Sequence, residues 1–384
     1  MSDLARSFAR QKLADLPKEP PRPIQGSLPA TAEEPEDEYS SESSLSSTGT
    51  VLPSPSQNLV AAPPNPWPSY FAQELFLPYT LPSGDEAKYH AYLTPPSTPK
   101  APLFVCHHGA GACGMSFALF AIELHRLLPE AGILCVEARQ HGSSIISPSG
   151  FPINNFNISV LSEDLWHAIS LTQSKLNWSQ LPPTILIGHS LGGAVVTDLA
   201  AKGHLGTSLL GYAVLDVVEG SALDALKTMH SWLASRPSVF PSVDGAIDWH
   251  IRSRTLRNRD SATVSVPPLM TQSSSGRWIW GIDLAITQPY WEDWFTGMSG
   301  KFLGAKGAKL LILAGTDRLD KELMIGQMQG KFQLQVLPNA GHFVHEDEPA
   351  RVAEMVVEFY KRNDRSALVL PPKVSELLAQ GKKV

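Results

Sequence analysis

The sequence predicts an α/β fold with a doubly wound, mostly parallel sheet, because buried strands and helical segments alternate along it. Runs such as TILI (184–187) and KLLILA (309–314) are apolar at successive positions, as strands covered on both faces are. Segments with helical periodicity lie between these runs. This alternation is typical of a parallel sheet with helices on both faces.

Short apolar runs define the expected strands. Five are predicted to be buried: LFVC (103–106), ILCVEA (133–138), TILI (184–187), LGYAVL (210–215) and KLLILA (309–314). A sixth, FQLQVL (332–337), alternates more and is expected near a sheet edge. One helix should begin after Ser162, with acidic residues in its first turn. The last helix should begin near Pro349 and bury an apolar face. That face holds Val352, Met355, Val356 and Phe359.

Composition divides the chain into a folded body and flanking segments. Residues 1–66 are rich in Pro, Ser and Glu and are expected to be a disordered acidic segment. Residues 67–217 and 297–365 should form the α/β core, and 366–384 a C-terminal tail. Residues 218–296 break the alternation with a charged run and a dense aromatic patch. They are predicted to be a helical cap over the C-terminal edge of the sheet; a helical layer far from the site is the alternative.

Charge and cysteine content narrow the class of protein. The net charge is −6, and nine acidic against five basic residues in the first 50 positions account for −4 of it. A nearly neutral body without a basic stripe argues against nucleic-acid binding. No apolar run reaches the ~20 residues that cross a bilayer, and the charged N-terminus lacks the apolar stretch of a secretory signal. With three cysteines, a reducing compartment is expected, cytoplasmic and/or nuclear. Cys106 and Cys135 lie in apolar runs and are predicted to be core residues.

A G-x-S-x-G pentapeptide, residues 188–192, lies between the strand TILI and a helical run. That context favours a sharp strand-to-helix turn that raises the Ser190 hydroxyl above the sheet as a nucleophile. The flanking glycines leave room for backbone that passes close by. The helix that follows has unpaired N–H groups, so the N–H of Leu191 is a candidate donor to an oxyanion. An ordinary glycine-rich turn is the alternative.

A second oxyanion donor is expected in the loop after an early strand. LFVCHHGAGACG fits, and its small residues allow the backbone to approach a substrate carbonyl. We predict that the N–H of Ala110 is this donor.

The general base should follow the last strand, where a turn through Asn339 leads to His342. An unperturbed imidazole, with a pKa of ~6.5, can take the serine proton near neutral pH. His345 could make a metal pair with His342, but no closed ligand set is found and no metal site is predicted. The remaining histidines are assigned structural or surface roles, and Arg139 a structural one.

The acid that orients the base should lie between the nucleophile and the base. Asp216 ends the strand LGYAVL, and Asp317 follows the strand KLLILA. Spacing alone does not choose between them. The other acidic residues in these regions are interpreted as solvated or capping: Glu219, Asp320, Glu346, Asp347 and Glu348.

Several longer stretches resemble the eukaryotic protein phosphatase methylesterases, which are α/β-hydrolases. They are WPSYF (67–71), the His-Gly loop, LIGHSLGGA (186–194), LDVVEGSALDAL (215–226), YWEDWF (290–295) and residues 313–349, and the resemblance runs from 67 to about 362. This sequence departs from the family pattern in two places: the segment before YWEDWF is short, and the His-Gly loop is less rich in glycine.

The resemblance implies an activity and assigns the acid. The family removes the methyl group from the C-terminal leucine ester of the phosphatase 2A catalytic subunit, so this subunit, with its methylated tail, is the expected partner. By position the nucleophile is Ser190, the acid Asp216 and the base His342, with Asp317 as the rival acid. Acyl transfer by such a triad requires no metal or organic cofactor.

Two other functions fit the same sequence. A small-molecule esterase or lipase would use the same triad without preference for a methylated phosphatase. A phosphatase-docking module would bind the partner without turnover. The Ser-His-Asp set favours an enzyme over pure binding.

Overall fold

The computed structural model describes residues 66–315 and 319–364, all of which belong to one unit, residues 55–384. The predictions for residues 1–65, for the tail 366–384 and for Asp317 lie outside the described residues. Within the described ranges, no helix combines the length and the apolar character needed to span a membrane.

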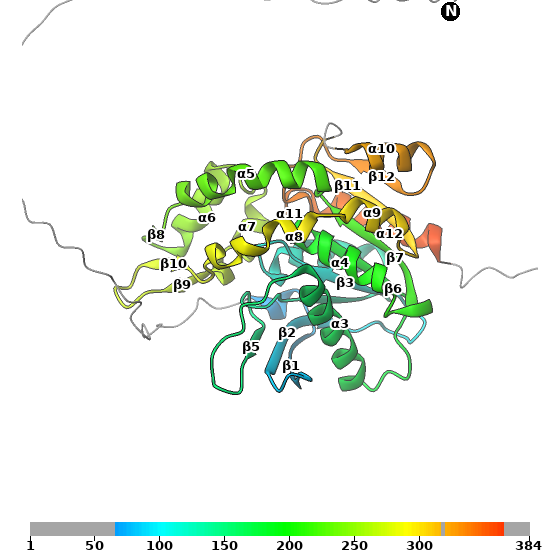
Figure 1. The fold of residues 1–384 in the computed structure, drawn as a ribbon, viewed down its shortest axis with the longest axis horizontal. Helices are drawn as coiled ribbons and strands as arrows, with labels where there is room; N and C mark the ends of the chain where they lie inside the picture. Colours follow the sequence, from blue (N-terminus) through cyan, green and yellow to red (C-terminus); the bar gives the residue numbers. More distant parts are fainter. Residues whose placement is uncertain (1–65, 316–318, 365–384) are drawn as a thin grey trace, which may run out of the picture. The chain divides into compact units, whose positions relative to one another are not determined.

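A nine-stranded sheet forms the centre of the fold, in the order β1-β2-β4-β3-β6-β7-β11-β12, with β5 paired to β2 (Figure 1). Strands β4, β3, β6, β7, β11 and β12 run parallel to one another, whereas β1, β2 and β5 pair antiparallel. The bounds are β1 Gln73–Thr80, β2 Glu86–Thr94, β3 Leu103–His107, β4 Gly132–Val136, β5 Ser144–Ile146, β6 Thr184–His189, β7 Leu209–Leu215, β11 Ala308–Leu313 and β12 Gln333–Val336. The predicted mostly parallel α/β sheet is confirmed.

The five apolar runs form β3, β4, β6, β7 and β11, and the more alternating run forms β12 at one edge of the sheet. β1, β2 and β5 were not predicted. β1 is an edge strand whose Phe76 side chain is 43% exposed, and it contains Pro78. A half-exposed edge strand lacks the continuous apolar run on which the prediction of buried strands rests.

Helices cover both faces of the sheet, and successive residues of each central strand serve opposite faces. Phe104 and Cys106 of β3 belong to one buried cluster, whereas Leu103 and Val105 belong to the other. Cys135 is also fully buried, so the predicted core role of both cysteines is confirmed. The main helices of the core are α2 Ala118–Leu127, α3 Ile158–Lys175, α4 Leu191–Lys202, α9 Met298–Gly304, α10 Lys321–Met328, α11 Val344–Asp347 and α12 Pro349–Asn363.

Helix α3 corrects the prediction that a helix begins after Ser162. It begins one turn earlier, at Ile158, and Ser162 is buried inside it, where its hydroxyl donates to Asp198 at 2.6 Å. The N–H of Ile158 donates to the carboxylate of Asp293, 135 residues away, at 2.7 Å. A carboxylate stabilises a helix N-terminus, and this one is supplied by tertiary structure. The N-cap residue, Asn157, is of a type favoured there, but its side chain makes no capping hydrogen bond.

Residues 218–296 connect β7 to the second half of the core and carry a second, three-stranded sheet in the order β8-β10-β9. Figure 1 shows this sheet at one end of the molecule, beside α5 and α6. The rings of Phe240 in β8, Trp249 in α6 and Trp280 in β10 pack edge-on or tilted against one another. The elements are α5 Glu219–Ser235, β8 Val239–Phe240, α6 Val243–Arg252, α7 Arg259–Ser265, β9 Met270–Gln272, β10 Trp278–Trp280 and α8 Trp291–Phe295, with short 3-10 helices η4 Pro267–Leu269 and η5 Leu284–Tyr290.

Candidate active site

Ser190 lies on a strained turn between β6 and α4. Its backbone has φ +52° and ψ −120°, a combination that side-chain-bearing residues rarely adopt. A Cβ added at Gly188 would lie 2.0 Å from the carbonyl oxygen of Gly192, so the close crossing of the backbone requires glycine there. The geometry is that of a strand-turn-helix elbow that presents a serine at the C-terminal edge of a sheet.

Asp216 and His342 meet at the same edge of the sheet. Asp216 follows β7, and its fully buried carboxylate accepts a hydrogen bond from the N–H of Ala314 at 2.8 Å through Oδ1. Its Oδ2 lies 2.9 Å from Nδ1 of His342. The imidazole is 46% exposed on its loop after β12. The buried carboxylate therefore orients the imidazole and leaves its Nε2 for other partners.

Two contacts fix the loop that carries His342. Asp347 accepts the N–H of Gly341 at 2.6 Å, and His189 Nε2 donates to the carbonyl oxygen of His342 at 2.9 Å. The ring centroids of His189 and His342 are 4.7 Å apart. Among the hydrogen bonds of residues 66–315 and 319–364, none joins the Ser190 hydroxyl to the His342 imidazole. Such catalytic contacts commonly tighten when substrate is bound.

The loop after β3 lies against the nucleophile. A Cβ added at Gly109 would lie 3.1 Å from Cβ of Ser190. The N–H of Gly111 donates to His141 Nε2 at 3.0 Å, and that of Ala112 to the carbonyl of Gly109 at 3.2 Å. In the described part of the chain the N–H of Ala110 makes no hydrogen bond.

The first residue of α4, Leu191, has no intrahelical acceptor for its N–H, which makes no hydrogen bond within the described ranges either. Both predicted oxyanion donors, the N–H groups of Ala110 and Leu191, therefore have no hydrogen-bond partner among the described residues.

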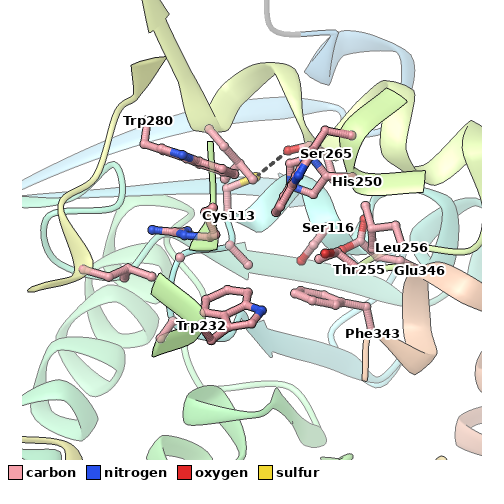
Figure 2. Close-up of a pocket in the computed structure, with 17 residues that line it drawn as sticks. Cys113, Ser116, Trp232, His250, Thr255, Leu256, Ser265, Trp280, Phe343 and Glu346 are labelled. Carbon is pink, nitrogen blue, oxygen red and sulfur yellow. Dashed lines mark hydrogen bonds between the residues drawn. The ribbon is translucent and has the colours of Figure 1, made fainter. Parts of the chain in front are cut away.

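A small cavity of about 40 Å³ adjoins this loop (Figure 2). Residues 110–113 form one wall, and side chains from residues 218–296 form most of the others. Figure 2 shows Trp280 on one side of the cavity and Leu256 and Glu346 on the opposite side. The Arg236 guanidinium lies over the ring of Trp280, 4.4 Å from its centroid, and 5.0 Å from that of Trp232. The cavity therefore combines apolar aromatic walls with one cation.

Glu346 corrects the interpretation that this acidic run is solvated. It is 2% exposed, and its burial raises the pKa of the carboxyl to about 8. Its Oε2 makes no hydrogen bond in the part of the chain that is described. Asp320 caps α10, as predicted, by accepting the N–H of Leu323. Glu219 likewise accepts two N–H groups at the start of α9.

Buried histidines surround the site, although only structural or surface roles were predicted for them. Burial lowers the pKa of His107, His141 and His345 to about 3 and that of His189 well below its usual value. His345 is buried beside Ser116, 3.3 Å from its hydroxyl. The described residues contain no group of three or more His, Cys, Asp or Glu side chains that could hold a metal ion.

Comparison with known proteins gives consistent matches over most or all of the chain. Residues 104–355 match the alpha/beta hydrolase family. Protein phosphatase methylesterase 1 of Aspergillus fumigatus is 53% identical over 99% of this chain and 93% of its own length. The protein of that name from Gibberella zeae is 50% identical over the full length of both chains, and that from Schizosaccharomyces pombe is 44% identical over 80% of this chain and 87% of its own.

Solved structures resemble the chain in fold at much lower identity. E-2-(acetamidomethylene)succinate hydrolase matches with a TM-score of 0.58 at 17% identity, over 75% of this chain and all of its own. A peroxisomal alpha-beta-hydrolase of Saccharomyces cerevisiae matches with a TM-score of 0.56 at 13% identity, over 80% of this chain and 94% of its own. These similarities support the fold alone.

Proposed function

This chain belongs to the protein phosphatase methylesterase family of α/β-hydrolases, and from that premise we propose that it demethylates the C-terminal leucine methyl ester of the phosphatase 2A catalytic subunit. The main support for the mechanism is the 2.9 Å contact between Oδ2 of buried Asp216 and Nδ1 of His342, beside the strained turn of Ser190. We assign these three residues as acid, base and nucleophile.

The reaction is acyl transfer. His342 takes the proton of Ser190 while the serine oxygen attacks the carbonyl carbon of the ester. The resulting oxyanion is stabilised by the N–H groups of Leu191 and Ala110, and the protonated imidazole gives its proton to the departing methoxide, so methanol leaves. Water, deprotonated by the same imidazole, then hydrolyses the acyl-enzyme and restores the serine. These steps use no metal or organic cofactor.

Specificity should come from the peptide, since methanol is small and offers little binding energy. We propose that residues 218–296 act as a cap over the C-terminal edge of the sheet. The cavity walls that they supply, with apolar aromatic side chains and Arg236, are suited to a peptide tail that has apolar side chains and polar carbonyl groups. Because the proposed substrate is a phosphatase subunit, we also propose that the protein acts in the cytoplasm and/or the nucleus.

The test is incubation of the purified protein with methylated phosphatase 2A catalytic subunit, followed by quantification of released methanol and of the remaining methyl ester. The wild-type protein should release methanol, and Ser190→Ala should abolish release, because no other group is assigned as nucleophile. Release by Ser190→Ala at the wild-type rate would refute the assignment of Ser190.

The same experiment separates the alternative functions. A general esterase would hydrolyse p-nitrophenyl acetate readily and leave the methylated subunit unchanged. A docking module would bind the subunit without release by either protein. If Ser190→Ala loses turnover but still binds the subunit, catalysis and docking are separable in this protein.

A further inference from the structure

We propose that two buried histidines, His108 and His141, are positioning residues that hold the oxyanion loop, residues 109–111, in the orientation needed for catalysis. The inference rests on the proposed ester hydrolysis and goes beyond it by assigning a role to residues outside the triad. Both side chains are buried, at 1% and 8% exposure, and their ring centroids are 5.2 Å apart.

Each histidine connects this loop to the turn that follows β4. His108 Nε2 accepts the N–H of Ala138 at 3.0 Å, and its Nδ1 lies 2.8 Å from the carbonyl oxygen of Gly109. An imidazole that accepts at one nitrogen and is neutral carries its hydrogen on the other, so Nδ1 donates to the Gly109 carbonyl. Glu137 Oε2 lies 3.3 Å from Nε2, but the Ala138 N–H already occupies that nitrogen.

His141 also connects the loop to this turn, but it accepts a hydrogen bond from the loop, whereas His108 donates one. Its Nε2 accepts the N–H of Gly111 at 3.0 Å, which leaves the hydrogen on Nδ1. Nδ1 then donates to the carbonyl oxygen of Arg139 at 2.9 Å. Burial favours the neutral ring that this acceptor role needs. One histidine therefore donates to the loop, and the other accepts from it.

These bonds determine where the N–H of Ala110 points. In a trans peptide plane the N–H and the preceding C=O point in opposite directions, so fixing the Gly109 carbonyl also fixes the Ala110 N–H. His108 holds that carbonyl directly. His141 holds the next peptide plane through Gly111, where φ is +71°. The N–H groups of Gly111 and Ala112 are occupied by His141 and by the Gly109 carbonyl, whereas that of Ala110 has no partner among the described residues and can donate to an oxyanion.

Matched substitutions at the two positions test this role. The side-chain end of Gln superposes on Nε2 of His, and that of Asn superposes on Nδ1. At position 141 the loop contacts Nε2, so His141→Gln should keep the acceptor and His141→Asn should lose it. At position 108 the loop contacts Nδ1, so His108→Asn should keep the donor and His108→Gln should lose it.

The readouts are kcat and KM for the methylated phosphatase subunit, and the rate at which a fluorophosphonate labels Ser190. For His141→Asn and His108→Gln we expect kcat and the labelling rate to fall about 10²–10³-fold, the effect of losing one oxyanion donor, with KM within about threefold of wild type. His141→Gln and His108→Asn should stay within about tenfold. Melting temperatures measured alongside confirm that each variant is folded.

The inference requires opposite preferences at the two positions: Gln is tolerated at position 141 and Asn at position 108. If Gln and Asn have equal effects at each position, or if kcat per folded molecule is unchanged in all four variants, the two histidines have only a packing role and the inference is wrong. A wild-type protein that labels with the fluorophosphonate but releases no methanol would instead refute the proposed function, while the labelling rates would still test the inference.

Discussion

Replacing Asp216 by asparagine should nearly abolish activity without unfolding the protein. The two side chains have the same shape, but the N–H of Ala314 donates to Asp216 Oδ1 at 2.8 Å and so requires an oxygen there. The Asn NH₂ group is therefore directed at His342, where Oδ2 now lies 2.9 Å from Nδ1. Two donors cannot share a hydrogen bond, so the imidazole must move its own hydrogen from Nδ1 to Nε2.

An imidazole that carries its hydrogen on Nε2 cannot take the serine proton. The wrong tautomer costs about 10⁴-fold in kcat in a serine triad, equivalent to about 5.5 kcal/mol at 1.36 kcal/mol per factor of ten. KM should change little because Asp216, whose side chain is fully buried, does not contact substrate.

The assay is methanol release from the methylated phosphatase subunit under saturating conditions, with thermal unfolding measured in parallel. Asp317→Asn is the matched control, since its position in the sequence also suits the acid, and it should keep kcat within about threefold. Asp216→Asn with more than a tenth of wild-type activity, or a 10⁴-fold loss in Asp317→Asn, would refute the assignment of the acid.

Two further predictions concern stability. Gly188→Ala should prevent folding of the core, because its Cβ would meet the Gly192 carbonyl at 2.0 Å, whereas Gly203→Ala, with φ +74° and open space around it, should cost only about 1–2 kcal/mol; equal urea midpoints for the two would contradict the elbow geometry. Glu346 keeps its proton in the folded state up to a pKa of about 8 but loses it near 4.5 when unfolded, so the wild-type protein loses stability as pH rises between these values. Glu346→Gln should remove this loss, and its free energy of unfolding relative to wild type, from urea titrations, should rise by about 2–3 kcal/mol from pH 6 to pH 8; a constant difference would show that Glu346 is ionised when folded.

The sequence predicted the parts of the molecule whose chemistry is local. Central strands such as β6 contain an apolar run and are buried at every position, and the Gly-His-Ser-Leu-Gly turn has a backbone that only that pattern of glycines permits. Sequence spacing leaves the acid open between Asp216 and Asp317, and the assignment to Asp216 comes from the family resemblance, because the chain alone does not say which strand end faces His342. The contact between Asp216 and His342 joins residues 126 positions apart.

Features that depend on tertiary packing could not be predicted. The N-terminus of α3 is held by the carboxylate of Asp293. Glu346 lines a cavity together with side chains from distant parts of the chain. The roles of His108 and His141 depend on which backbone groups their rings reach. A signal was present, since both histidines lie just past the ends of adjacent parallel strands, β3 and β4, and such residues converge at one edge of a sheet.

The proposed mechanism requires that Ser190 carries the acyl group during turnover. The most direct test is rapid acid quenching of the wild-type protein during turnover of a methylated peptide ester, followed by digestion and mass spectrometry of the peptide that contains Ser190. The proposed mechanism predicts the substrate acyl group on the Ser190 oxygen and none in Ser190→Ala. An acyl group on another residue, or continued turnover by Ser190→Ala, would contradict it.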